Sequence, residues 1–230
     1  MIKGFRGTSL VDYPEKIASV IYTYGCNFRC PYCYNIELIR REYYRELTDI
    51  SEEEVLAKLL ERKNFIQGVV ISGGEPTIWD RKLRFFMERI KYELDLPIKL
   101  DTNGSKPDLL ENLFKDNLID FLALDFKTSL KRYEELGGKA EIIKETLSLL
   151  KNYAEKVEIR ITLYPPLVTP EDFEEMLPYL QGFTRVALQK YLPEKNLSGK
   201  GVSPYSEEES LYFLEKLKNF FPELKIYNRL

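Results

Sequence analysis

The chain has 230 residues, with 34 Lys and Arg against 37 Asp and Glu, no His, and a formal net charge of −3. This near balance argues against a general nucleic-acid binder that neutralises phosphates. No apolar run approaches the length of a membrane span, and the start of the chain lacks the apolar core of a secretory signal. We therefore expect one globular domain over residues 1–230, with neither a membrane nor a nucleic-acid partner.

Residues 1–16 are expected to form an N-terminal extension, and the segment from Gly4 to Pro14 is compatible with a short hairpin. Ile17 to Thr23 is rich in β-branched and aromatic residues, which favours a strand. Tyr24-Gly25 then turns the chain directly into a loop. The loop therefore begins at the end of a predicted strand.

All three cysteines of the chain lie in that loop, with the spacing Cys26-x3-Cys30-x2-Cys33. An odd number of clustered cysteines does not form a disulfide framework. The small number of thiols suggests a reducing compartment, and we therefore expect a cytoplasmic protein. A closed zinc site needs four ligands, and no histidine is present to complete one. Soft thiolates also select iron–sulfur clusters, and a four-iron cluster with three protein ligands keeps one iron open. The loop predicts a metal centre that does chemistry; a structural three-thiolate site completed by an outside ligand is the alternative.

A helix is expected to start in a capping box at Ser51. The next predicted strand, Gly68 to Ile71, follows this helix, and the strand ends in Ser72-Gly73-Gly74-Glu75-Pro76. Paired glycines let the backbone approach a ligand closely, and Glu75 is an acceptor suited to a cation. The same residues also suit a plain turn.

The alternation of helices and strands continues along the chain. A helix over about 81–93 precedes a strand over 98–101 that runs into Thr102-Asn103-Gly104, where Asn-Gly is also an ordinary turn signal. A helix over 107–115 precedes a strand over 119–124 that closes with Asp125-Phe126-Lys127. Strand alternation places Asp125 and Lys127 on one face, as part of a site or as a surface ion pair.

The last part of the chain repeats the pattern. A helix follows Gly137-Gly138 to about Tyr153, and the strand Val157 to Leu163 carries Arg160, which can pair bidentately with a ligand carboxylate or face solvent. We then expect a helix capped at Thr169-Pro170 and a strand over 184–188 ending at Gln189. The C-terminal region over 190–230 is expected to hold an irregular connection over 195–204, a helix from Ser206 to about Phe220 and a possible strand from Leu224 to Tyr227. Such alternation predicts a parallel sheet with helices outside, whose working residues lie at the carboxyl ends of the strands.

The cysteine spacing, with the aromatic Tyr32 directly before Cys33, resembles the signature of the radical S-adenosylmethionine (SAM) superfamily. The resemblance implies an α/β fold, an incomplete parallel (β/α)6 barrel, in which Cys26, Cys30 and Cys33 are catalytic and hold a [4Fe–4S] cluster. In such enzymes S-adenosylmethionine chelates the open iron, and one electron splits it to give a 5′-deoxyadenosyl radical. The cofactor-binding residues that the resemblance implies here are Tyr32, Gly73, Gly74, Glu75, Thr102, Asn103, Asp125, Lys127, Arg160 and Gln189.

Three further features narrow the resemblance: Thr8 to Pro14, the Cys30-Pro-Tyr-Cys33 segment, and the order of the later motifs. Together they look like the activating proteins of anaerobic ribonucleoside-triphosphate reductases. That likeness implies an activase that generates a glycyl radical on a partner protein and takes electrons from a flavodoxin- or ferredoxin-type donor. Two positions depart from the pattern, because Tyr34 stands where that group often has histidine and Ile36 replaces a common proline.

Two other functions stay open at this point. The first is a radical enzyme acting on a small, purine-like metabolite, and the second is a non-catalytic metal-binding module. Once the cysteine loop, cofactor motifs and strands are assigned, no inserted domain remains to enclose a small substrate, which favours a macromolecular target. No cysteine remains for an auxiliary cluster either, so we expect a minimal catalytic core.

Overall fold

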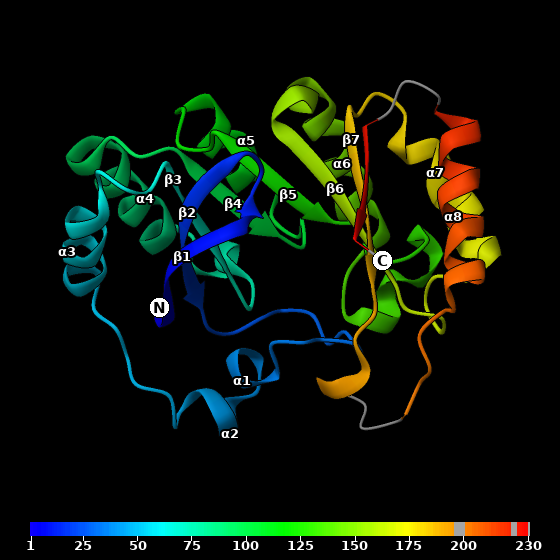
Figure 1. Ribbon diagram of the computed structural model, residues 1–230, viewed down its shortest axis with the longest axis horizontal. Helices are drawn as coiled ribbons and strands as arrows, with labels where there is room; N and C mark the ends of the chain where they lie inside the picture. The colour runs from blue at the N-terminus through cyan, green and yellow to red at the C-terminus, as the bar shows by residue number, and fades with distance from the viewer. Residues whose placement is uncertain (196–200, 222–224, 230) are drawn as a thin grey trace. The chain divides into compact units, whose positions relative to one another are not determined.

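The structure is a computed structural model that describes residues 1–195, 201–221 and 225–229 (Figure 1). The chain forms two compact units, and each gathers segments that are distant in sequence. The first unit holds residues 1–27, 35–102 and 108–122, and the second holds 28–34, 103–107 and the chain from 123 onward. The expectation of a single domain stays a prediction.

The first unit opens with a β-hairpin. β1 (Ile2–Tyr13) pairs antiparallel with β2 (Lys16–Thr23), and Glu15 in the turn has a φ of 62°. The short hairpin within residues 4–14 was therefore a wrong prediction. Gly4 and Gly7, which suit a turn, lie inside β1 where its register shifts against β2, so they accommodate irregularities in one long strand.

The remaining strands of the first unit run parallel to β2. β2 pairs with β3 (Gly68–Gly73), and β3 pairs with β4 (Ile98–Thr102), in chain order. All five residues of β4 are buried, as expected for a strand covered on both faces. β5 (Phe121–Asp125) passes from the first unit into the second after Leu122.

The helix predicted from the capping box at Ser51 begins where the sequence signal places it. Ser51 caps α3, since its side chain accepts a hydrogen bond from the Glu54 backbone N–H. Val55, Leu56 and Leu59 are buried. The helical segments assigned wholly or mostly to this unit are α1 (Ile36–Ile39), α2 (Arg41–Tyr44), α3 (Glu52–Arg62), the 3₁₀ helix η1 (Pro76–Trp79), α4 (Arg81–Leu94) and α5 (Pro107–Lys115).

The second unit is also a parallel strand–helix arrangement. Its strands β6 (Val157–Leu163), β7 (Arg185–Lys190) and β8 (Lys225–Arg229) are parallel neighbours in chain order. Its helical segments are η2 (Leu130–Leu136), α6 (Ala140–Leu150), η3 (Lys151–Lys156), α7 (Pro170–Leu180), η4 (Pro193–Lys195) and α8 (Glu207–Phe220). α7 and α8 lie side by side (Figure 1). The parallel α/β fold predicted from the alternation is thus confirmed.

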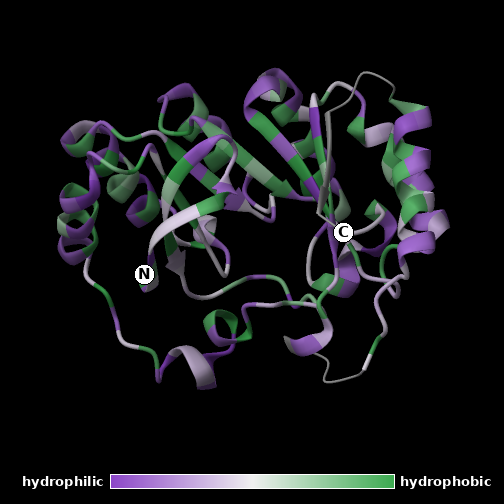
Figure 2. Ribbon diagram, viewed as in Figure 1, coloured by the Kyte–Doolittle hydropathy of each residue, from purple (hydrophilic) through white to green (hydrophobic). Residues whose placement is uncertain are grey.

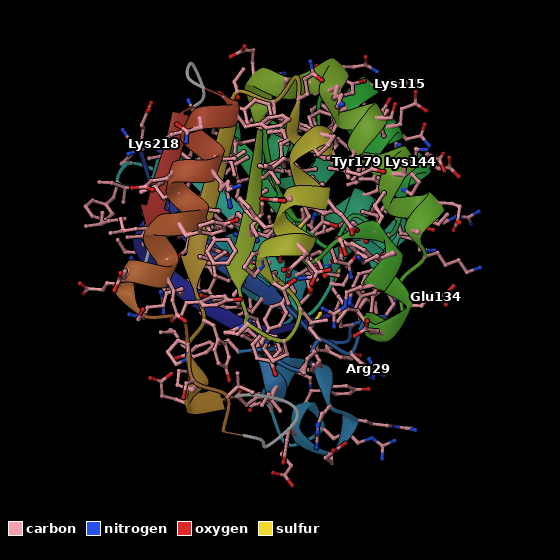
Figure 3. All side chains as sticks on the ribbon, turned by 90° about the vertical axis from the view of Figure 1, so that its right-hand side faces the viewer. Arg29, Lys115, Glu134, Lys144, Tyr179 and Lys218 are labelled. Atoms are coloured by element: carbon pink, nitrogen blue, oxygen red, sulfur yellow. The ribbon has the colours of Figure 1, made fainter. Side chains whose placement is uncertain are left out.

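Local sequence sets the starts of α7 and α8. Thr169 and Ser206 each form a capping box, with Asp172 and Glu209 as the respective third helical residues. Hydrophobic and hydrophilic residues alternate along these helices (Figure 2), and Lys218 projects from α8 into solvent (Figure 3). The helices therefore bury one face and leave the other in water.

The C-terminal expectations fall partly outside the described residues. The possible strand is present as β8, but Leu224 is not among the described residues, nor are residues 196–200 of the irregular connection. In the described ranges, no helix combines the length and apolar character needed to span a membrane.

Candidate active site

The cysteine loop leaves the carboxyl end of β2 through a glycine turn. Gly25 has a φ of 81°, a backbone conformation that side chains disfavour, and a Cβ there would lie 2.9 Å from Ile78 Cδ1. The Gly25 N–H also donates to the Leu38 carbonyl at 2.7 Å. The turn predicted at Tyr24-Gly25 is confirmed, and it places Cys26 directly beyond the strand end.

The three cysteines of the loop differ in burial. None of the cysteines is in a disulfide; Cys30 is buried, whereas Cys26 and Cys33 are partly exposed. Cys26 belongs to the first unit and Cys30 and Cys33 to the second, where the Cys33 N–H donates to the Cys30 carbonyl at 3.2 Å. Burial raises the pKa of the Cys30 thiol, and the Lys127 charge acts in the opposite direction.

Within the second unit, Phe28 anchors the loop. Its ring is 2% exposed and packs edge-on against Tyr133, with ring centroids 6.2 Å apart. Gly138 makes room for both rings, since a Cβ there would lie 2.8 Å from Phe28 Cζ and 2.9 Å from Tyr133 Cδ1. The Arg29 N–H donates to the Leu136 carbonyl at 2.8 Å. Our sequence reasoning missed these roles, although the Gly137-Gly138 pair marked the place.

Close contact between two chain segments explains why residues 73 and 74 are glycines. A Cβ on Gly73 would lie 2.2 Å from the Thr23 carbonyl oxygen, and one on Gly74 would lie 2.0 Å from the Gly25 carbonyl oxygen. Only glycine allows this approach of β3 to the end of β2. Asn35, just after the cysteine loop, donates to the Gly73 carbonyl at 3.2 Å. Ligand contact by these glycines stays a prediction.

Glu75 and Thr102, both predicted to lie in the site, are in direct contact. The Thr102 hydroxyl donates to Glu75 Oε1 at 2.8 Å, and the Thr77 N–H and hydroxyl donate to the same oxygen at 3.1 and 2.6 Å. Glu75 is 1% exposed, so its carboxyl group is buried, and these donors fix its orientation. The arrangement caps η1 and holds Glu75 beside the end of β4.

Asn103 forms the turn that follows β4. Its side-chain oxygen accepts from the Ser105 N–H at 3.0 Å, which is an Asx-turn. Gly104 has a φ of 76°, and its carbonyl accepts from the Thr146 hydroxyl at 2.6 Å. The structure thus gives Asn103 a turn role and leaves its contact with a cofactor as a prediction.

Asp125, Lys127 and Arg160 form one charged network in the second unit. Arg160 Nε donates to Asp125 Oδ1 at 2.8 Å, and Lys127 Nζ donates to Asp125 Oδ2 at 3.2 Å. Burial by itself raises the pKa of Asp125, but the charges of Arg160 and Lys127 outweigh it and lower this pKa to about 2. Burial lowers the pKa of Lys127, yet the Asp125 carboxylate, Tyr32 and Cys30 outweigh it and leave this pKa well above its ordinary value. Asp125 and Lys127 are therefore both charged at neutral pH.

Tyr32 stands beside this network. Lys127 Nζ lies 5.9 Å from the centre of the Tyr32 ring, and the Tyr164 ring packs against Tyr32 at 5.2 Å. Tyr191 packs against Tyr164 at 4.8 Å, so buried aromatic rings back Tyr32. Sequence reasoning did not single out Tyr164 or Tyr191, although both directly follow strands.

Gln189 lies near the carboxyl end of β7. Thr162 on the neighbouring strand β6 places its hydroxyl 3.5 Å from Gln189 Oε1, and the two residues are paired in the strand register. The structure thus brings together Tyr32, Asp125, Lys127 and Arg160 in one unit and Glu75 and Thr102 in the other, while Gln189 contacts Thr162.

The donor set fits a cluster with one open iron. Three thiols outside any disulfide are present on one loop, and each can bind a different iron of a [4Fe–4S] cluster. Over the described residues, no group of three or more Cys, Asp or Glu side chains is gathered to hold a single metal ion. The guanidinium and ammonium of Arg160 and Lys127 suit an anionic group such as a cofactor carboxylate.

Comparison with known sequences supports this assignment. The family model described as Radical SAM superfamily matches residues 20–180. A protein of Methanocaldococcus jannaschii, named as a candidate glycyl-radical enzyme activating enzyme, is 33% identical over 84% of this chain and 81% of its own length. The pyruvate formate-lyase-activating enzyme of Clostridium pasteurianum is 28% identical over 94% of this chain and 90% of its own length. The 7-carboxy-7-deazaguanine synthase of Thermococcus kodakarensis is 27% identical over 80% of this chain and 78% of its own length.

Solved structures share the fold. The anSMEcpe protein with bound AdoMet matches with a TM-score of 0.67 at 19% identity, over 89% of this chain and 61% of that chain. QueE from Escherichia coli matches with a TM-score of 0.56 at 15% identity, over 99% of this chain and 92% of that chain. This chain therefore spans about three-fifths of one structural neighbour and nearly all of the other.

Proposed function

Because the chain belongs to the radical SAM superfamily, we propose that it is an activating enzyme that abstracts a hydrogen atom from a glycine of a partner protein. The observation that carries this proposal is similarity along most of the chain to relatives named as glycyl-radical or pyruvate formate-lyase activating enzymes. The partner that we propose is an anaerobic ribonucleoside-triphosphate reductase.

In this proposal Cys26, Cys30 and Cys33 hold a [4Fe–4S] cluster and leave one iron to S-adenosylmethionine. The bound cluster and cofactor together supply a strong hydrogen abstractor when one electron is delivered. The protein has to orient the cofactor and exclude water. The buried position of Cys30 is suited to excluding water.

Two groups of residues are proposed to hold the cofactor. Glu75, with the adjacent backbone of Gly73 and Gly74, is an acceptor for the methionine ammonium, and Thr102 keeps its carboxylate oriented. Arg160 and Lys127 supply positive charge for the carboxylate, with Asp125 holding both side chains in place. Tyr32, Asn103 and Gln189 complete the proposed set.

We further propose that the protein acts in the cytoplasm and takes its electron from a flavodoxin- or ferredoxin-type donor. The support is the composition, because few cysteines without disulfides suit a reducing compartment. The chemistry also needs a low-potential one-electron source, which such donors provide.

A second function is favoured by a separate observation. The similarity to 7-carboxy-7-deazaguanine synthase supports a radical SAM enzyme that acts on a small, purine-like molecule. The two functions differ in whether the radical ends on a protein, so one experiment separates them.

The test uses reconstituted, reduced protein mixed without oxygen with S-adenosylmethionine and the anaerobic reductase of the same organism. We expect a glycyl doublet in the electron paramagnetic resonance spectrum, and replacing the candidate glycine of the reductase with alanine should erase it. Active cofactor cleavage with no doublet on any glycyl-radical enzyme of that organism supports the small-molecule function instead. A reconstituted protein without a cluster signal supports a non-catalytic metal-binding module.

A further inference from the structure

The single tryptophan of the chain lies next to the entry of the cysteine loop. Trp79 ends η1, four residues after Glu75, and its indole Nε1–H donates to the Tyr24 carbonyl at 2.9 Å. Tyr24 is two residues before Cys26. A side chain from the segment that follows the paired glycines thus holds the backbone that leads to the first cysteine.

Aromatic rings surround this hydrogen bond. The Tyr24 ring lies 4.8 Å from Trp79, edge-on, and 4.7 Å from Tyr44. Lys3 Nζ lies 5.4 Å from the centre of the Tyr24 ring, and Lys82 Nζ lies 5.8 Å from the Trp79 ring. Packing against Trp79 and Tyr44 restrains Tyr24, the residue whose carbonyl Trp79 binds.

Three successive carbonyls before Cys26 accept hydrogen bonds from residues 74–79. The Gly74 N–H donates to Thr23 at 2.9 Å, the Glu75 N–H donates to Gly25 at 2.8 Å, and Trp79 donates to Tyr24 between them. Thr23 and Gly73 are the last paired residues of β2 and β3. The connection between the two segments therefore continues past the end of the sheet.

Trp79 makes the one bond of these three that depends on a particular side chain. The other two donors are backbone N–H groups, which most residues provide. Gly25, with its positive φ, is the only residue between Tyr24 and Cys26, so a restraint on Tyr24 acts on Cys26 through a single residue.

We propose that Trp79 is a positioning residue that fixes Cys26 relative to the Gly73–Glu75 segment. The inference rests on the proposed function, in which Cys26 binds the cluster and Gly73 to Glu75 receive the cofactor ammonium. In this proposal Trp79 acts through the Tyr24 carbonyl. Its effect is to keep the first cluster ligand and the cofactor segment in one fixed geometry.

The test compares two replacements that remove the N–H donor. The first, Trp79→Phe, keeps an aromatic ring. The second uses 3-benzothienylalanine, whose ring has nearly the shape of indole but no N–H donor. Because Trp79 is the only tryptophan of the chain, growth of a tryptophan auxotroph with this analogue replaces Trp79 alone. Lys82→Ala is the matched control, since it removes a charge beside Trp79 and keeps the hydrogen bond. The measurements are iron content, S-adenosylmethionine affinity, melting temperature, and the paramagnetic resonance spectrum of the reduced cluster with cofactor.

We expect both replacements to retain the cluster, to weaken cofactor affinity about three- to tenfold, as for one lost hydrogen bond, and to change the spectrum of the cofactor-bound cluster. Lys82→Ala should match the wild type in cofactor affinity and in the spectrum of the cofactor-bound cluster. Wild-type affinity and spectrum in the benzothienylalanine protein overturn the inference, even if the melting temperature falls, because packing would then be the only role of Trp79. Failure of the wild-type protein to bind cluster or cofactor refutes the proposed function instead.

Discussion

At the scale of single residues, the most informative group is Asp125 with its two cations. Its side chain keeps 32% of its surface exposed, whereas Lys127 and Arg160 keep 12% and 13%. Two largely buried cations therefore contact one carboxylate. Guanidinium and ammonium groups also suit a ligand carboxylate.

Removing a member of this network should weaken cofactor binding. We expect Arg160→Ala and Asp125→Ala each to keep the cluster spectrum and to lose about 1.5–3 kcal/mol of S-adenosylmethionine binding, the contribution of a charge-assisted hydrogen bond. Anaerobic calorimetric titration measures this loss. Arg89→Ala, which removes an arginine that pairs with Glu53 and Glu93 on the surface, is the control. Unchanged affinity in both network variants would remove these residues from the site.

The low pKa of Asp125 also predicts how stability depends on pH. The folded-state pKa of about 2 lies below the ordinary value of 3.8, so the stabilisation is fully present above about pH 4 and is lost as pH falls through about 2. In cluster-free protein, the free energy of unfolding should therefore decrease more between pH 4 and pH 2 in the wild type than in Asp125→Asn. Urea unfolding at several pH values checks this, and parallel decreases in the two proteins would contradict it.

The cysteines carry the sharpest prediction at this scale. Single changes of Cys26, Cys30 or Cys33 to Ala should abolish stable cluster binding and cofactor cleavage, because the chain has no further cysteine and no histidine to substitute. Iron analysis and the ultraviolet–visible spectrum after reconstitution measure the loss. Wild-type cleavage by Cys30→Ala would show that the ligand assignment is wrong.

At the scale of elements, the site depends on how two loops pack. The segment Phe28–Tyr34 is held against η2 by the packing of Phe28 on Tyr133 and by the hydrogen bond from the Arg29 N–H to the Leu136 carbonyl. The missing side chain of Gly138 leaves room for the two rings. The Tyr133 hydroxyl accepts from the Lys127 N–H at 2.9 Å, so one buried ring contacts both Phe28 and the strand end that carries the charged network. Packing at η2 therefore sets the geometry of several proposed site residues.

Filling the space at Gly138 should disturb this packing. A methyl group there meets two buried rings, so we expect Gly138→Ala to reduce the free energy of unfolding by about 1–3 kcal/mol and to lower the iron retained after reconstitution. Gly201→Ala is the matched control, since a Cβ there has no heavy atom within 4 Å. Wild-type stability and iron content in Gly138→Ala would contradict this account of the loop.

At the scale of the whole molecule, the three cysteines limit how many iron–sulfur clusters the chain can hold. They suffice for one cluster with an open iron and leave none for a second. Reconstituted protein should therefore contain about four irons and four acid-labile sulfides per chain. Chemical analysis measures both quantities, and a content near eight irons would contradict a single-cluster enzyme.

Much of the fold could be predicted from local sequence, whereas the cluster ligands stay a prediction from the cysteine spacing. The cysteine spacing, the turn at Gly25 and the caps at Ser51, Thr169 and Ser206 depend on neighbours only a few residues away, so pattern and propensity suffice. The parallel strands and the placement of the motifs at strand ends followed from the same alternation.

Only the tertiary structure decided which distant residues meet. The pairing of residues 2–13 with β2, the bond from Thr102 to Glu75 and the space that Gly138 leaves for Phe28 each join segments that local patterns do not connect. The same holds for Trp79 and Tyr24, which are 55 residues apart in sequence. Such contacts depend on side-chain shape and on the close approach of glycine backbone, whereas the sequence by itself determined the alternation of parallel strands and helices, the three thiols and the order of the motifs.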